Sequence, residues 1–166
     1  MVDLMQHQFS EVHGLIKTAK EKVFRAINVE LINLYWQIGE YVHHKVESSQ
    51  WGKSVVHELS EYIRQHEPDI KGFSAPNIWR MKQFFEAYQN SEKLSALVRE
   101  ISWTNNMLIL AKSSSEQERE FYLLHTRQEK YSSRELERQI DSGLFERVVL
   151  HKLSLKHHPL FRCAAP

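Results

Sequence analysis

Histidines and one aspartate-lysine pair are the residues of this 166-residue chain whose types could bind a metal or activate water. Histidine nitrogens bind zinc, and a carboxylate followed two residues later by lysine can hold Mg²⁺ when paired strands present them. Two adjacent histidine pairs occur, His43-His44 and His157-His158, and neither has a carboxylate or cysteine at metal-ligand spacing. Asp69-Ile70-Lys71 falls in a predicted turn, with no second strand to complete a metal cage. We therefore predict no metal site, no cofactor and no catalytic residue.

Residues 51–88 carry the side chains best suited to contact DNA. Arg, Asn and Gln on an exposed helical face can reach base edges, while Lys and the N–H groups at a helix start can hold a phosphate. On a helix that starts at Ala75, such residues point away from the apolar side. The candidate nucleic-acid-binding residues here are Lys71, Ser74, Asn77, Arg80, Lys82 and Gln83. The alternative is that Asn77 caps or solvates the helix and that Arg80 pairs with a neighbouring acid.

A second basic group lies in the segment YSSRELERQI, where Arg134 and Arg138 are four residues apart and therefore share a helical face. Glu135 and Glu137 dilute its charge. Contact with phosphates is one interpretation, and ion pairs within the helix are an equally good one. The four tryptophans could stack on bases, but core packing is the favoured role for them.

Helices must position all of these residues, because Gly and Pro are few and strand-like alternation is hard to find. A long helical stretch is predicted from about Phe9 to Glu47, with an apolar repeat at three- and four-residue steps. A second helix runs to His66 before Pro68, and a third opens with Ser74 as N-cap and Pro76 in its first turn. Helices two and three, joined by the loop PDIKGF, have the outline of a helix-turn-helix.

The later helices are predicted from their capping residues. Ser113 or Ser114 is expected to cap the helix that contains Phe121, and Ser132 or Ser133 to cap the one that contains Leu136. Gly143 is expected to stop or kink the chain, and the final residues look frayed. The predicted fold class is all-α, with a helix-turn-helix-like core and a long N-terminal helix.

The composition limits the cellular setting and the partners. Lys+Arg 22 against Asp+Glu 21 leaves a formal net charge of +1, so any nucleic-acid site must be a local basic patch. Cys163 is the only cysteine, which fits a reducing cytoplasm. Neither a signal peptide nor a membrane-spanning run is evident. We expect one helical domain over residues 1–150 and a C-terminal tail over residues 151–166.

Six segments carry a family resemblance through their order and spacing. They are Tyr35-Trp36-Gln37-Ile38-Gly39, Trp51-Gly52, Gly72-Phe73-Ser74, Asn77-Ile78-Trp79-Arg80-Met81, Ser102-Trp103 and Ser133-Arg134-Glu135-Leu136-Glu137-Arg138-Gln139-Ile140. Over roughly residues 12–150 the chain resembles the N-terminal domain of the YhcG-type PDDEXK nuclease family, a domain of unknown function. Members usually continue into a C-terminal nuclease domain, and the end of this chain does not resemble that continuation. The resemblance implies a non-catalytic accessory role, in a fragment of a nuclease or a naturally short relative.

The predicted function is a non-catalytic DNA-binding accessory domain that positions or assembles a YhcG-like nuclease on nucleic acid, and one alternative stays open. The alternative is a protein-protein interaction module without direct DNA contact, with a nuclease domain, a partner chain or a second copy as partner. The long N-terminal helix favours this alternative, because an apolar repeat of this length often pairs with another helix. A steep loss of affinity with rising salt is expected only for phosphate contacts.

Overall fold

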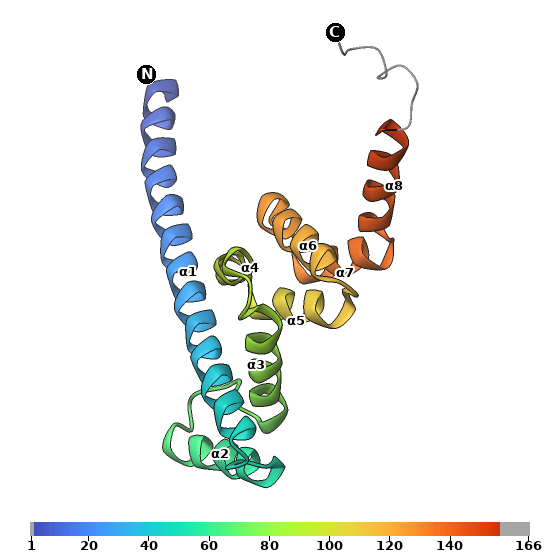
Figure 1. Cartoon of the computed structure of the whole chain (residues 1–166). Coiled ribbons are helices and arrows are strands. Elements are labelled where there is room, and N and C mark those ends of the chain that lie inside the picture. The colour runs from blue at the N-terminus through green and yellow to red at the C-terminus, as the bar shows by residue number, and fades with distance from the viewer. Residues whose placement is uncertain (1, 157–166) are drawn as a thin grey trace. The chain divides into compact units, whose positions relative to one another are not determined.

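A computed structural model describes residues 2–156 of the chain (Figure 1). Contacts between residues divide the chain into two compact units, residues 1–102 and residues 103–166. The boundary falls between Ser102 and Trp103, without a linker segment, inside the stretch that the sequence predicts to be one domain. Every regular element in the described residues is helical, which confirms the all-α fold class and the long N-terminal helix.

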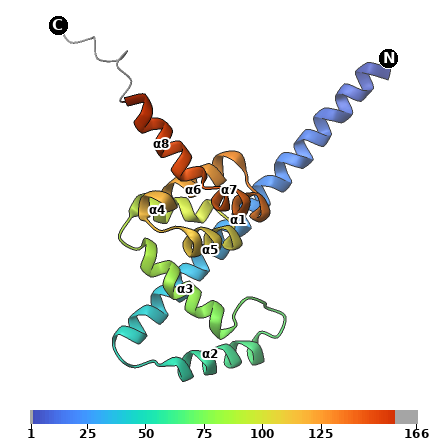
Figure 2. The ribbon, with the colours of Figure 1, turned by 90° about the vertical axis from the view of Figure 1, so that its right-hand side faces the viewer.

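The first unit contains four α-helices and a short 3-10 helix. Their bounds are α1 Val2–Glu47, α2 Lys53–His66, α3 Ala75–Tyr88, α4 Glu92–Leu97 and η1 Val98–Glu100. Figures 1 and 2 show α3 lying along the C-terminal part of α1, with α2 near the C-terminal end of α1. The N-terminal half of α1 extends beyond the other elements of this unit. The core of the unit therefore gathers around the C-terminal half of α1.

The core of the first unit forms between α1 and α3. Ile32, Val42, Ile78, Met81 and Phe84 are fully buried in it. Gly39 makes this packing possible, because a Cβ atom there would overlap the backbone carbonyl of Met81. The two helices thus approach closely at one position where the sequence supplies no side chain.

The helix α3 begins and packs as the sequence predicts. Ser74 is its N-cap residue and Pro76 lies in its first turn. Its apolar residues Ile78, Met81 and Tyr88 are all buried. The connection from α2 to α3 runs from residue 67 to residue 74, whereas a helix-turn-helix usually has a turn of about three or four residues. The helix-turn-helix therefore stays a prediction.

The second unit contains α5 Trp103–Lys112, α6 Glu116–Glu129, α7 Ser133–Asp141 and α8 Leu144–Lys156. Its buried side chains include Ile109, Tyr122, Leu123, Leu136 and Ile140. The helix α8 crosses the predicted start of the C-terminal tail at residue 151, and residues 157–166, with Cys163 and His157-His158, lie outside the described residues. No helix in the described part of the chain combines the length and the apolar character that crossing a bilayer requires.

Serine side chains cap α6 and α7 of the second unit. Ser115 accepts a hydrogen bond from the backbone N of Glu118 at 3.1 Å, and Ser132 accepts one from the backbone N of Glu135 at 3.2 Å. The prediction of Ser113 or Ser114 as the first cap is therefore wrong by one or two residues, because three serines in a row offer the same chemistry. Gly143 separates α7 from α8 with a φ of 67°, a conformation that favours glycine.

A candidate interaction surface on the long helix

The N-terminal half of α1 is exposed over its described side chains, since every residue from Met5 to Ile27 is exposed. Asn28 follows as a half-buried residue, and its side-chain amide donates hydrogen bonds to the carbonyl oxygens of Arg99 and Ile101, at 3.1 Å and 3.2 Å. The exposed segment nevertheless carries large apolar side chains, with Phe9 64% and Ile27 58% exposed.

These apolar residues lie along one side of α1, and we call them the stripe; the exposed Glu30 lies among them. Residues 5, 23 and 41 are 18 positions apart, which is five turns at about 3.6 residues per turn, so they share one side of the helix. The other members fall within about 40° of that side at about 100° per residue. The stripe consists of Met5, Phe9, Val12, Ile16, Val23, Ile27, Leu34 and Tyr41, all exposed.

The stripe and the core-facing side of α1 are different faces. The fully buried Ile32 is nine residues from both Val23 and Tyr41, which places it about 180° around the helix from them. Apolar residues of α1 therefore lie on more than one face, since Val42 is buried while others, such as Leu15 and Ile16, are exposed. A helix with apolar residues on two faces has more to bury than its own unit covers.

The C-terminal end of the stripe opens into an apolar groove. Residues of α1 form one wall and residues on and just before α2 form the other, around a volume of about 250 Å³. The rings of Tyr41 and Trp51 meet edge to face across it, with centroids 5.6 Å apart. Its lining includes the apolar residues Leu34, Ile38, Tyr41, Trp51, Leu59 and Ile63. Nothing in the local sequence pairs the α2 residues with the stripe, so the groove emerges only in the folded unit.

The candidate DNA-binding residues of the first unit do not form one free surface. Asn77 donates a side-chain hydrogen bond to the carbonyl oxygen of Gly72, and Lys82 donates one to Glu86. Ser74 caps α3 by position, but its side chain makes no cap hydrogen bond. Arg80 and Gln83 are exposed and three residues apart on α3, and Lys71 is exposed before it.

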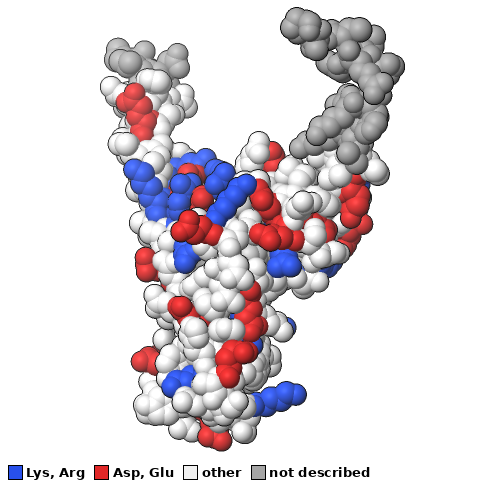
Figure 3. Space-filling model, viewed as in Figure 1, with Lys and Arg blue, Asp and Glu red and all other residues white. Residues whose placement is uncertain are grey.

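The second group of candidate residues, Arg134 and Arg138, lies on α7. Arg138 is 73% exposed and pairs with Glu135 at 2.8 Å, as the ion-pair interpretation expects. Glu135 also accepts a hydrogen bond from Gln139 at 2.7 Å. Arg134 is exposed one turn earlier. In Figure 3, Lys and Arg side chains gather over the middle of α1 and around α4 on the face in view.

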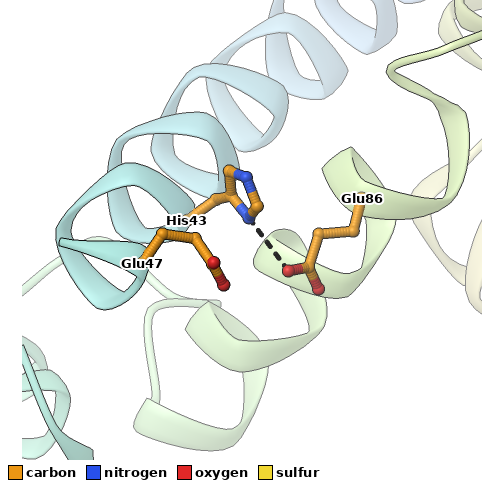
Figure 4. Close-up of side chains that lie close together, drawn as sticks. All are labelled: His43, Glu47 and Glu86. Carbon is orange, nitrogen blue, oxygen red and sulfur yellow. Dashed lines mark hydrogen bonds and ion pairs between the residues drawn. The ribbon is translucent and has the colours of Figure 1, made fainter. Parts of the chain in front are cut away.

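One cluster of possible metal ligands spans α1 and α3. Figure 4 shows His43 and Glu47 of α1 with Glu86 of α3, and their ligand atoms lie within 4.8 Å of one another. The sequence-based prediction that neither histidine pair has a carboxylate at metal-ligand spacing is therefore wrong for His43. Glu47 follows it by four residues, which is one helical turn. Glu86 is too distant in the sequence to have been recognised with them.

Hydrogen bonds within this cluster already satisfy Glu86. Its Oε1 lies 2.9 Å from Nδ1 of His43 and also accepts a hydrogen bond from Nζ of Lys82. Partial burial favours the neutral acid, but the hydrogen bonds from Lys82 and His43 outweigh it and lower the pKa of Glu86. The lysine thus supplies the positive charge that a bound cation would otherwise provide, which makes the cluster a link between α1 and α3.

The tryptophan with the clearest surroundings has a structural role. The Trp36 ring meets those of Phe84 and Phe85 edge to face, with centroids 5.9 Å and 5.2 Å away. The guanidinium carbon of Arg99 lies 4.9 Å from the Trp36 ring centre. Trp36 therefore packs between α1 and α3, as core packing predicts, and its faces are not offered to a base.

Comparison with protein families finds a match over most of the chain. The family model described as the DUF1016 N-terminal domain matches residues 11–147, which includes most of α1 and the elements up to the start of α8. No curated protein and no solved structure shows significant similarity to the chain.

Proposed function

This chain belongs to the DUF1016 N-terminal domain family, and we propose that it is a non-catalytic assembly domain that joins protein chains through the stripe on α1. The observation that carries the proposal is the exposure of the whole stripe, from Met5 to Tyr41. Single exposed apolar side chains are ordinary on a soluble protein, but a row of them along one side of a helix marks an interaction site.

The proposal favours the interaction module over direct DNA contact. The stripe consists of exposed apolar side chains. By contrast, two of the candidate DNA-binding side chains, Asn77 and Lys82, already hydrogen-bond within the chain. The formal net charge of +1 also gives little general attraction to phosphate. In this proposal the assembly serves a nuclease system of the YhcG-like PDDEXK type in the cytoplasm, in keeping with the family resemblance and the single cysteine.

DNA engagement remains a second candidate function, because Arg80 and Gln83 are exposed next to each other on α3. Lys71 is exposed in the preceding loop. Side chains of these types can contact base edges and phosphates together. A domain that both assembles and touches DNA would position a nuclease on its substrate.

The proposal is tested by the size of the complex that the chain forms in its native cells. Tagged full-length chain is compared with Ile16→Glu, which places a charge on the stripe. The matched control is Thr18→Glu, which adds the same charge about 200° around the helix, off the stripe. We expect Ile16→Glu alone to reduce the complex to the size of the monomer. A native chain that already runs as a monomer in extracts would contradict the proposal.

The second candidate is tested with the purified chain and labelled duplex DNA, by fluorescence anisotropy at low and physiological salt. Binding that saturates and weakens steeply with salt supports DNA engagement. Absence of binding at high micromolar protein, together with stripe-dependent assembly, leaves the interaction module as the function.

A further inference from the structure

Resting on this proposed function, we propose that the partner which covers the stripe is a second copy of this chain, with the two α1 helices antiparallel. In this arrangement the exposed N-terminal segment of each copy lies in the apolar groove of the other. The stripe pairs with itself about its midpoint, near Val23.

Five of the eight stripe positions face another stripe position in such a reciprocal pair. When Val23 of one copy faces Val23 of the other, two residues lie opposite each other if their numbers add up to 46. Val12 then faces Leu34 of the other copy, and Met5 faces Tyr41. The groove lined by Leu34, Ile38 and Tyr41 on α1 and by Trp51, Leu59 and Ile63 therefore receives Met5, Phe9 and Val12.

A partner would stabilise the N-terminal segment as a helix. In proteins most helical stability comes from packing an apolar face. Residues 5–27 are all exposed, so their apolar side chains are not buried within their own unit. A second copy supplies the missing contacts to both segments at once.

The size of the stripe suits a stable dimer. The eight side chains of the stripe expose roughly 800 Å² on one copy, and a stable interface commonly buries about 800 Å² on each partner. The twofold pair leaves no part of the stripe uncovered. A smaller partner would leave either the N-terminal segment or the groove exposed.

Two charged residues near the stripe favour the antiparallel orientation. Glu30 and Lys20 both lie about 50° or less from the centre of the stripe at about 100° per residue. A parallel pair places each of them level with its own copy, so like charges meet. The antiparallel pair places Glu30 level with Ile16 and Lys20 level with Ala26, which separates the like charges.

Disulfide cross-linking of the purified full-length chain tests the orientation. Cys163→Ser is included in every chain, so that each carries only the introduced thiol. Chains with Val12→Cys are mixed with tagged chains that carry Leu34→Cys and then oxidised. We expect the mixed cross-linked dimer, while Val12→Cys alone stays uncross-linked, because its two copies lie about 33 Å apart along the helix at about 1.5 Å per residue.

Charge substitutions and the solution mass complete the test. Ile16→Glu places an acid opposite Glu30 of the second copy and weakens association at least about tenfold, and adding Glu30→Lys to the same chain restores it. Cross-linking of Val12→Cys chains to one another overturns the antiparallel orientation. If the purified chain is a monomer, the second copy is not the partner. If the stripe-dependent complex is nevertheless present in native cells, the proposed assembly function stands with another partner. A monomer both in purified form and in native cells overturns the dimer and the assembly function together.

Discussion

The side-chain amide of Asn28 on α1 donates a hydrogen bond to the backbone carbonyl oxygen of Arg99 at 3.1 Å, across 71 residues of sequence. The same amide also reaches the carbonyl oxygen of Ile101. Arg99 in turn donates a hydrogen bond from Nε to the side-chain oxygen of Asn33, also on α1, at 2.7 Å. This exchange marks the point along α1 where the exposed segment ends and the packed half begins.

Replacing Asn28 by Ala removes a donor that two carbonyl groups share. Because partly buried acceptors then lose a protein partner, we expect the free energy of unfolding to fall by about 1 to 3 kcal/mol. Urea unfolding followed by circular dichroism measures it. Lys22→Ala, at an exposed position on the same helix, is the control and should leave the midpoint nearly unchanged. Equal effects of the two substitutions would show that the hydrogen bonds do not fix α1 to η1.

A methyl group at Gly39 tests the close approach of α1 and α3. The added Cβ would lie 2.7 Å from the carbonyl carbon of Met81, so the helices must move apart. We expect Gly39→Ala to cost at least about 1 to 3 kcal/mol, since backbone cannot move aside as a flexible side chain can. Gly14→Ala is the matched control, because nothing lies within 4 Å of its added Cβ. That control should slightly stabilise the helix, and the thermal midpoints of the two variants should move in opposite directions.

The lowered pKa of Glu86 predicts a specific acid sensitivity. Burial by itself raises this pKa, and the hydrogen bonds from Lys82 and His43 more than offset it. A carboxyl whose pKa is lower in the folded chain stabilises the fold above its unfolded pKa, and this stabilisation is lost as the pH falls through the folded pKa. We therefore expect Glu86→Gln to be less stable than the native chain at neutral pH.

The difference between the native chain and Glu86→Gln should shrink as the pH falls below the ordinary value of 4.5. Urea unfolding at a series of pH values measures it. Glu40→Gln, an exposed carboxyl of α1, is the control for a general change in charge. A stability difference that does not change with pH would mean that the Glu86 carboxylate does not stabilise the fold through its charge.

The neighbours Arg80 and Met81 separate a surface role from a core role. Arg80 is exposed, while Met81 is fully buried. If α3 contacts DNA, Arg80→Ala weakens binding of duplex DNA by about 1 to 3 kcal/mol without lowering the melting temperature. Met81→Ala lowers the free energy of unfolding by about 2 to 5 kcal/mol. Anisotropy and thermal melting measure the two effects, and unchanged DNA affinity in Arg80→Ala would show that the proposed recognition face is wrong.

Local chemistry made much of the fold predictable. Ser74 and Pro76 mark the start of α3, because N-caps and first-turn prolines act within one helical turn. The end of α1 at Glu47 is also as predicted. Its start is Val2 instead of about Phe9. The sequence could not predict that Ser115, and not Ser113 or Ser114, caps α6, because each of these serines can accept the same hydrogen bond.

The candidate surface was predictable only in part. The apolar repeat of α1 is visible in the sequence, but buried Ile32 and exposed Val23 look alike until the position of α3 is known. The groove needs Trp51 and Ile63 beside Tyr41, and the link to Glu86 needs a residue 43 positions from His43. These arrangements depend on tertiary contacts, for which spacing along one helix gives no signal.

The 18-residue spacing of the stripe has a mechanical consequence. An apolar repeat of 3.5 residues forces helices to wind around each other, whereas five turns in 18 residues keep the apolar line straight along a straight helix. Two helices that meet along such a line pack side by side without coiling around each other. They can separate without unwinding. The geometry of α1 thus suits a complex whose subunits can exchange.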